Sequence, residues 1–232
     1  MEDILFIDKP KGMSSFDVIR VLRKKLKIKK MGHAGTLDPQ ATGLLIIGVG
    51  KGTKKLKEFA QLPKTYLMEV LLGKRTETGD LEGEVIEEKE VKKVDIKKVE
   101  RVLKEMEGEI ELQVPLYSAV KFKGKPLYKY AREGIKITPP KRKTRIFYLK
   151  LLGWKKEGKF FVLKIEMKCQ KGTYARSVGE EIGKRLNLPA TLKNLRRTKI
   201  GGFSVSEAKK LTEIKGENKK VEVSDKIKSI FT

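Results

Sequence analysis

The spacing of apolar residues predicts an alternation of strands and helices along the chain. Short apolar or alternating stretches are typical of strands that are buried on one or both faces. Six stretches have this character: 4–7, 44–49, 64–72, 84–91, 146–152 and 160–168. Because helical stretches separate them, the pattern as a whole predicts a mixed α/β fold.

In four other stretches, apolar residues recur at intervals of three or four, which predicts amphipathic helices. The expected apolar faces carry Phe16, Ile19, Leu22 and Leu26; Leu56, Phe59 and Ala60; Ile96, Val99, Leu103 and Met106; and Val178, Ile182 and Leu186. Residues that favour N-caps precede the first three helices, namely Ser14 or Ser15, Thr53 and Asp95. Gly108 is expected to end the third helix, and the fourth runs toward Pro189.

The chain carries a large positive charge. Its 232 residues include 54 Lys and Arg against 30 Asp and Glu, a formal net charge of +24. Such an excess predicts a polyanionic partner, and nucleic acid is the leading candidate. Abundant Lys beside abundant Glu also hints at a thermophilic source.

Several classes of protein are disfavoured by what the sequence lacks. The N-terminus has no basic start followed by an apolar run, as a signal peptide would, and no apolar stretch approaches membrane-spanning length. We therefore expect a cytoplasmic protein with no membrane partner. The single cysteine, Cys169, excludes an internal disulfide, and with only one histidine it leaves little for a zinc site.

The most unusual stretch is Gly32–Leu45, which contains the only histidine, His33, and an acidic residue, Asp38, among three glycines. Glycine lets a backbone turn sharply or approach a ligand closely. Pro39 restricts its own φ and biases Asp38 toward an extended conformation. The stretch therefore predicts either an ordinary turn or a stiff loop that presents a carboxylate.

This stretch resembles the catalytic motif of the TruB family, the tRNA pseudouridine-55 synthases, and matches its fixed positions from Gly32 to Leu45. Further segments resemble the family in the same order, between Lys9 and about Leu211. They include a Lys-Thr-Tyr at 64–66, the loop Arg75–Gly83, and Cys169–Arg176. The resemblance implies a pseudouridine-synthase-like α+β fold, with a central, mostly antiparallel sheet flanked by helices.

The resemblance also implies a domain organisation. The catalytic domain is expected over residues 1–211, with an insertion at about 113–145 that grips RNA like a thumb. This insertion is rich in basic and aromatic residues, which suit phosphate contact and stacking on unpaired bases. Its start departs from the family, because Leu112 and Val114 stand where the family has Gln and Pro. Residues 212–232 are expected to be a short tail rather than a full PUA-like domain.

Three catalytic residues follow from the resemblance. Asp38 is the ionised carboxylate that acts beside the sugar, as a nucleophile or as a base. Tyr66 stacks on the flipped uracil and assists removal of the C5 proton, and Arg176 pairs with Asp38 where the two meet in a central cleft. The expected RNA-binding and base-pocket residues are Lys9, His33, Lys64, Lys121, Arg132, Arg142, Tyr174, Leu195, Arg196 and Arg197.

The implied reaction needs neither a redox step nor an activated phosphate, so no cofactor and no metal are expected. The expected partner is the T-arm stem-loop of tRNA, bound by a monomer. Three alternatives stay open at this stage. They are a synthase that works with a guide RNA, a non-catalytic RNA-binding or RNA-chaperone protein, and a metal-dependent nuclease.

Overall fold

The computed structural model describes residues 2–215, which fall into two compact units. The first unit combines the N-terminal residues up to Thr65 with the chain from Arg196 onward, and the second spans Tyr66–Leu195. Strands β4 (Lys64–Leu72) and β12 (Ala190–Ile200) run from one unit into the other. Most of the predicted tail at 212–232 lies outside the described residues, and the single domain expected over residues 1–211 stays a prediction.

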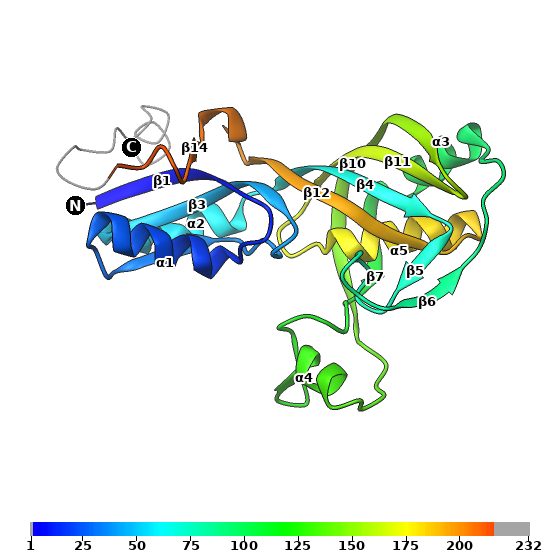
Figure 1. The fold of residues 1–232 in the computed structure, drawn as a ribbon, viewed down its shortest axis with the longest axis horizontal. Coiled ribbons are helices and arrows are strands. Elements are labelled where there is room, and N and C mark those ends of the chain that lie inside the picture. Colours follow the sequence, from blue (N-terminus) through cyan, green and yellow to red (C-terminus); the bar gives the residue numbers. More distant parts are fainter. Residues whose placement is uncertain (1, 216–232) are drawn as a thin grey trace. The chain divides into compact units, whose positions relative to one another are not determined.

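The first unit is built on the strand order β14-β1-β3-β12 (Figure 1). Strand β1 (Glu2–Lys9) pairs antiparallel with β3 (Thr42–Gly50), and β2 (Met31–Ala34) pairs antiparallel with β3 as well. Strand β14 (Lys209–Lys210) is parallel to β1, and β12 is parallel to β3. The short strand β13 (Phe203–Ser204) folds back on the end of β12.

Both faces of this part of the sheet are buried, which explains why residues 44–49 are continuously apolar. Helix α1 (Ser15–Leu26) packs its Ile19 and Leu22 with Ile7 and Ile47 on one face. On the other face, helix α2 (Leu56–Gln61) packs Phe59 against a cluster that also contains Phe6, Ile46 and Phe203. A 3-10 turn, η1 (Lys51–Lys55), precedes α2, and another, η2 (Val205–Glu207), follows β13.

The second unit has the strand order β12-β4-β11-β10-β7. Strands β10 (Lys141–Glu157) and β11 (Phe160–Cys169) form a long antiparallel hairpin, and β7 (Gly108–Gln113) pairs antiparallel with the start of β10. Helices α3 (Ile96–Glu105) and α5 (Ala175–Leu186) pack in this unit, and β5 (Lys74–Thr76) and β6 (Val85–Glu88) form a separate hairpin (Figure 1).

Between β7 and β10 the chain leaves the body of the second unit as a separate excursion (Figure 1). We call residues 114–140 the thumb segment. It contains the two-residue strands β8 (Lys121–Phe122) and β9 (Lys125–Pro126) and the short helix α4 (Leu127–Arg132). The rings of Phe122 and Tyr130 form an edge-to-face pair with 6.2 Å between centroids, and the Tyr130 hydroxyl donates to Phe122 O. The segment therefore has a small core of its own.

The predicted mixed α+β class with a mostly antiparallel sheet is confirmed, and so are several local features. Ser14 caps α1 in a capping box with Asp17, and Asp95 caps α3 by accepting from Lys98 N. The helix predicted from Val178, Ile182 and Leu186 is present as α5, and Arg176 lies in its first turn. None of the helices in the described part of the chain is both long and apolar enough to cross a membrane.

Three local predictions were wrong. Phe16 does not face the core: it is 49% exposed, with the guanidinium groups of Arg20 and Arg23 over its ring. Thr53 does not cap α2, because it lies in η1 and its hydroxyl donates to Gly50 O. Finally, β10 continues to Glu157, beyond the predicted end at 152, because residues 153–157 pair with residues 160–164 of β11.

Candidate functional site

In the first unit, Asp38 lies on a turn whose main chain is held from several directions. Ala41 N donates to Asp38 O, which closes the turn. On the N-terminal side, the buried Leu37 exchanges hydrogen bonds with the Ser15 hydroxyl, through both its N–H and its carbonyl. On the C-terminal side, Pro39 O accepts from Gly12 N at 2.8 Å. The neighbouring backbone is thus fixed while Asp38 itself is exposed.

Two buried cations complete this support. Lys9 has 0% exposure, and its ammonium group donates to three carbonyls, those of Pro10, Met13 and Pro39. Arg197 has 1% exposure and donates to Leu44 O and Gly35 O, with Thr36 O at a longer 3.4 Å. We therefore assign both side chains to holding the Asp38 loop, in place of the direct RNA contact expected from the sequence.

The backbone around Arg197 explains one of the glycines. Gly43 has a φ of +101°, and a Cβ built there would lie 2.2 Å from Arg197 O. Strands β3 and β12 pair in parallel at this position, with Gly43 opposite Arg197. No residue with a side chain fits unless the two strands separate.

Burial also sets the charge states of two groups in this unit. Burial lowers the pKa of Lys9 to about 8, although the Asp38 carboxylate opposes the shift. Burial, together with the charge of Arg197, lowers the pKa of His33 below its usual value, so this side chain is neutral at pH 7. Its buried Nδ1 has no hydrogen-bond partner among the described residues.

Two other cations expected to contact RNA behave differently from each other. Lys64 is buried, and its ammonium group donates to Ala60 O and Leu62 O, each at 2.6 Å, so it too supports the backbone. Arg196 forms a bidentate pair with Asp8, at 2.9 and 2.7 Å, yet its side chain remains 40% exposed. The side chain of Arg196 is thus partly exposed to solvent, whereas the ammonium group of Lys64 is engaged with backbone carbonyls.

In the second unit, Arg176 is the centre of a polar network that includes Thr78, Asp80 and Tyr117. It is 6% exposed, and its two terminal nitrogens donate to Thr78 O at 2.8 Å and to Tyr117 O at 3.1 Å. Its Nε lies 3.8 Å from Asp80 Oδ2, an ion pair rather than a hydrogen bond. The guanidinium plane is therefore fixed by two backbone carbonyls from different segments.

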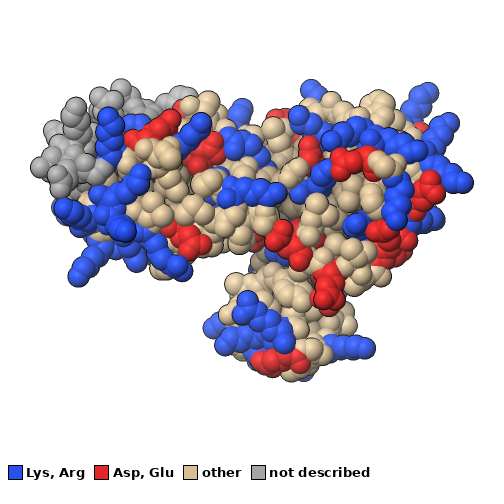
Figure 2. Space-filling view, viewed as in Figure 1, with Lys and Arg blue, Asp and Glu red and all other residues tan. Residues whose placement is uncertain are grey.

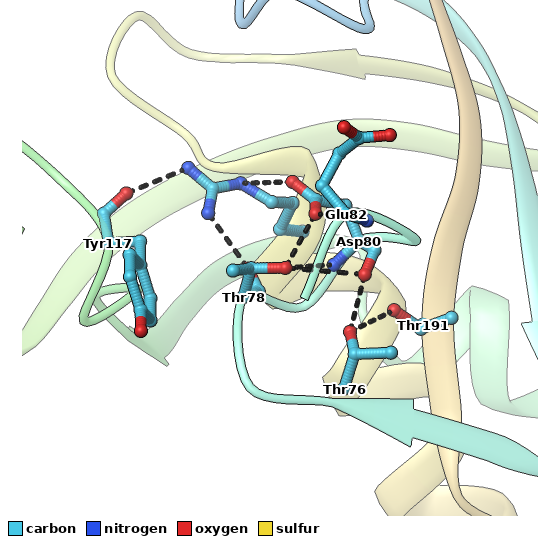
Figure 3. Close-up of polar contacts among 7 residues, drawn as sticks. Thr76, Thr78, Asp80, Glu82, Tyr117 and Thr191 are labelled. Carbon is cyan, nitrogen blue, oxygen red and sulfur yellow. Dashed lines mark hydrogen bonds and ion pairs between the residues drawn. The ribbon is translucent and has the colours of Figure 1, made fainter. Parts of the chain in front are cut away.

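Asp80 is held in turn by its own loop. Its Oδ1 accepts from the Thr78 hydroxyl and from Glu82 N, and its carbonyl accepts from the Thr76 hydroxyl (Figure 3). Sequence analysis matched this loop, 75–83, to a family segment but gave it no role, and so missed Thr78 and Asp80 as partners of Arg176. The sequence did contain an indication of this role, because the loop matches a family segment that is rich in hydroxyl and acidic groups.

The remaining pocket residues also lie in the second unit. Tyr66 is buried in β4, Leu195 is half-buried in β12, and Tyr174 is half-buried at the N-cap of α5. Glu180 lies one turn after Arg176 on the same helix. Burial raises the pKa of this carboxyl, although Arg75 and Arg176 oppose the shift.

The basic residues of the second unit that were expected to bind RNA are exposed. Lys121 and Arg132 lie on the thumb segment, and Arg142 lies at its base in β10. The Arg132 guanidinium lies over the Tyr128 ring, 5.4 Å from its centroid. Figure 2 shows Lys and Arg side chains gathered over α1 in the first unit and on the thumb segment in the second. Both surfaces suit contact with phosphates.

Comparison with known proteins agrees with this arrangement. The family model described as TruB family pseudouridylate synthase (N terminal domain) matches residues 23–175. A tRNA pseudouridine synthase B of Lactobacillus acidophilus is 43% identical over 224 residues, covering 95% of this chain and 75% of the relative. The protein of the same name from Endomicrobium trichonymphae is 39% identical over 208 residues, covering 90% of this chain and 89% of the relative.

Solved structures show the same fold in larger proteins. A chain of a Cbf5-Nop10-Gar1 complex superposes with a TM-score of 0.69 at 28% identity, covering 90% of this chain and 52% of that one. A chain of an H/ACA RNP bound to a substrate RNA superposes with a TM-score of 0.66 at 26% identity, and this chain spans 51% of its length. With its fold, its Asp38 loop and more than half of its length matched to one family, the chain belongs to the TruB family of pseudouridylate synthases.

Proposed function

We propose that this protein isomerises uridine to pseudouridine in the T-loop of tRNA. The observation that carries the proposal is the Asp38 turn, where an exposed carboxylate stands on a backbone held by Ser15, Lys9 and Arg197. Its relatives are named tRNA pseudouridine synthase B, which supports tRNA as the substrate. The net charge of +24 suits a polyanion of this kind.

The proposed reaction breaks the C1′–N1 glycosidic bond, turns the uracil, forms a C1′–C5 bond and releases the C5 proton. Asp38 acts at the sugar, either as a nucleophile that attacks C1′ or as a base that removes a proton from the sugar. The target base must leave its stack before it can react. Tyr66 then stacks on the uracil and assists loss of the C5 proton, while Tyr174 and Leu195 form walls of the base pocket.

We propose that Arg176 stabilises the ionised carboxylate of Asp38, as the family motif implies. A planar guanidinium matches a carboxylate better than an ammonium group does. The two carbonyls of Thr78 and Tyr117 support this role, because they restrict the orientation of the guanidinium. The proposed RNA contacts come from the exposed Lys121, Arg132, Arg142 and Arg196, with His33 as a neutral partner of the flipped loop.

The test is tritium release from C5-labelled uridine in an unmodified T-stem-loop, measured beside a gel-shift assay. Asp38→Asn keeps the shape of the side chain and removes its charge, so turnover should fall by at least about a thousandfold while RNA affinity is retained. Asp95→Asn is the matched control, because Asn also caps a helix well and Asp95 lies at the start of α3. Release by Asp38→Asn at a rate near wild type would refute the proposal.

A guide-RNA-dependent synthase is the second candidate, favoured by the similarity to the Cbf5 and H/ACA RNP structures. We propose the stand-alone activity, because relatives named tRNA pseudouridine synthase B match at 43% and 39% identity, against 28% and 26% for these structures. We also propose that the protein acts in the cytoplasm and as a monomer. The reaction transfers no electrons and no phosphate, so we expect full activity in EDTA. Turnover that appears only with an added guide RNA would favour the second candidate, and turnover that requires a metal would contradict our mechanism.

A further inference from the structure

A cavity of about 140 Å³ lies in the second unit, beside the start of α5. Its walls come from three segments: the end of β7, the start of β10, and the loop from Gln170 to Tyr174 that leads into α5. The side chains that matter here are Arg142, Thr144, Lys143, Lys171, Thr173 and Ser177. Arg142 and Tyr174, which also line this cavity, have roles in the proposed function, but the cavity itself has none.

The charged residues that line the cavity are all cationic. Arg142, Lys143 and Lys171 all line it, and no Asp or Glu is among the described residues that do. This is not general to the unit, because the larger hollow between α3 and β10 is lined by Glu100, Glu107 and Glu166 beside its lysines. In a chain with 30 acidic residues, three cations around a small cavity without an acid select for an anion.

The hydroxyl groups organise the walls. Thr173 Oγ1 donates to Gln170 O at 2.9 Å, so the 2.5 Å contact between the two threonine hydroxyls is a donation from Thr144 to Thr173. Ser177 Oγ donates to Gln113 O at 2.6 Å. Because these hydroxyl protons are already engaged, the charged donors left for an anion are the cationic side chains. Charge-assisted bonds of this kind are the stronger ones.

The position of the cavity links two parts of the proposed machinery. The base of the thumb segment closes here, where Gln113 pairs with Lys141 and Val114 N donates to Pro140 O. The opposite wall carries Ser177, the residue after Arg176. An anion in the cavity would therefore contact the base of the thumb segment and the first turn of α5 at once.

We propose that this cavity binds one backbone phosphate of the RNA substrate. The inference rests on the proposed function for the identity of the RNA, because a phosphodiester is the anion that an RNA stem-loop supplies. The phosphate accepts hydrogen bonds from Arg142 and Lys171, and it fixes the base of the thumb segment against α5.

The experiment uses the full chain and a set of T-stem-loop RNAs, each with one phosphate replaced by an uncharged methylphosphonate. Dissociation constants are measured by filter binding at one salt concentration for wild type, Arg142→Gln and Lys171→Gln. Lys156→Gln is the matched control, since Lys156 is also exposed and on the same strand as Arg142 but lies outside the cavity. Thermal melting checks that each variant is folded.

For wild type, one methylphosphonate position should weaken binding by about tenfold, the loss expected when a charge-assisted hydrogen bond is removed. Arg142→Gln and Lys171→Gln should each weaken binding of the unmodified RNA by a similar factor. In these two variants, the methylphosphonate at the sensitive position should cost little further affinity. In Lys156→Gln the methylphosphonate should still cost about tenfold.

The inference would be overturned if, at every methylphosphonate position, the loss of affinity from the RNA change and the loss from Arg142→Gln or Lys171→Gln multiplied. Such independence would indicate general attraction between the charges rather than one bound phosphate. Binding is measured separately from turnover, so the two proposals can fail independently. A protein that shows the coupling but makes no pseudouridine contradicts the proposed function alone. One that makes pseudouridine without the coupling contradicts the phosphate site alone.

Discussion

The two adjacent arginines of β12 provide the sharpest test of the structure, because sequence reasoning gave both the same role. Arg197 is buried and donates to the carbonyls that support the Asp38 loop, whereas Arg196 is 40% exposed and pairs with Asp8. We therefore expect Arg197→Met to impair stability and catalysis without changing direct RNA contact. Arg196→Met should weaken direct RNA contact and leave stability and catalysis largely unchanged.

The size of the effect follows from the hydrogen bonds that are lost. Arg197 makes two well-formed bonds, to Leu44 O at 2.8 Å and to Gly35 O at 2.9 Å, while the third, to Thr36 O at 3.4 Å, is too long to count. Each bond to a charged group is worth about 1.5–3 kcal/mol, and removing the buried charge returns part of that sum. We expect the free energy of unfolding to fall by about 3 kcal/mol, which lowers Tm by roughly 6–12 °C in a chain of this size.

Catalysis should fall as well, because the Asp38 loop loses one of its anchors. A displacement of about 1 Å at a reacting group can cost about a hundredfold in rate. Turnover is measured by tritium release well below the lowered Tm, and RNA affinity by gel shift over a range of salt concentrations. Arg197→Met should keep the wild-type slope of log affinity against log salt, whereas Arg196→Met should reduce it by roughly 0.7–0.9 if it loses one phosphate.

The opposite pattern would refute this reasoning. If Arg197→Met melts and turns over like wild type but shows weaker binding with a reduced salt slope, then Arg197 contacts RNA directly and the Asp38 loop does not depend on it. Arg197→Lys adds a second check, because it keeps the charge but loses the planar fork. It should recover the salt slope in either case, and should restore only part of the stability.

Three further predictions follow from the same geometry. Lys9 has a pKa of about 8 in the folded protein against 10.5 unfolded. Above pH 8 its ammonium group therefore loses a proton, and with it one of the three N–H donors that the carbonyls of Pro10, Met13 and Pro39 accept from. Turnover should fall as the pH rises through 8. The unfolded chain binds more protons between these two values, so the free energy of unfolding should instead rise over that range; a parallel fall in both would contradict the assignment. Gly43→Ala should destabilise the protein by at least about 2 kcal/mol in denaturant melts, because its Cβ would lie 2.2 Å from Arg197 O, and an unchanged midpoint would show that the strands can separate freely. Tyr66→Phe keeps the ring, so it should cleave the glycosidic bond but stall before releasing the C5 proton, which single-turnover assays can separate; wild-type tritium release would mean that the hydroxyl has no part in this step.

Features that depend on neighbours along the chain could be predicted from the sequence. The capping box at Ser14, the cap at Asp95 and the start of α5 near Arg176 all appeared where the local pattern indicated. A cap or an apolar stripe acts within one or two turns of a helix, so a few residues are enough to determine it. The turn at Asp38 belongs to this group only in part: Pro39 restricts the backbone locally, but the contacts that hold the turn come from the distant Ser15, Lys9 and Arg197.

The roles of the long basic side chains were decided only by the tertiary structure. Lys9, Lys64 and Arg197 look like surface cations in the sequence, yet each is buried against backbone carbonyls. Arg197 meets Gly35 and Leu44 across more than 150 residues of chain, and only the parallel pairing of β12 with β3 brings these carbonyls to it. A Lys or Arg can lie in solvent or satisfy a buried carbonyl equally well, and the sequence around it does not record which carbonyls the fold leaves unpaired.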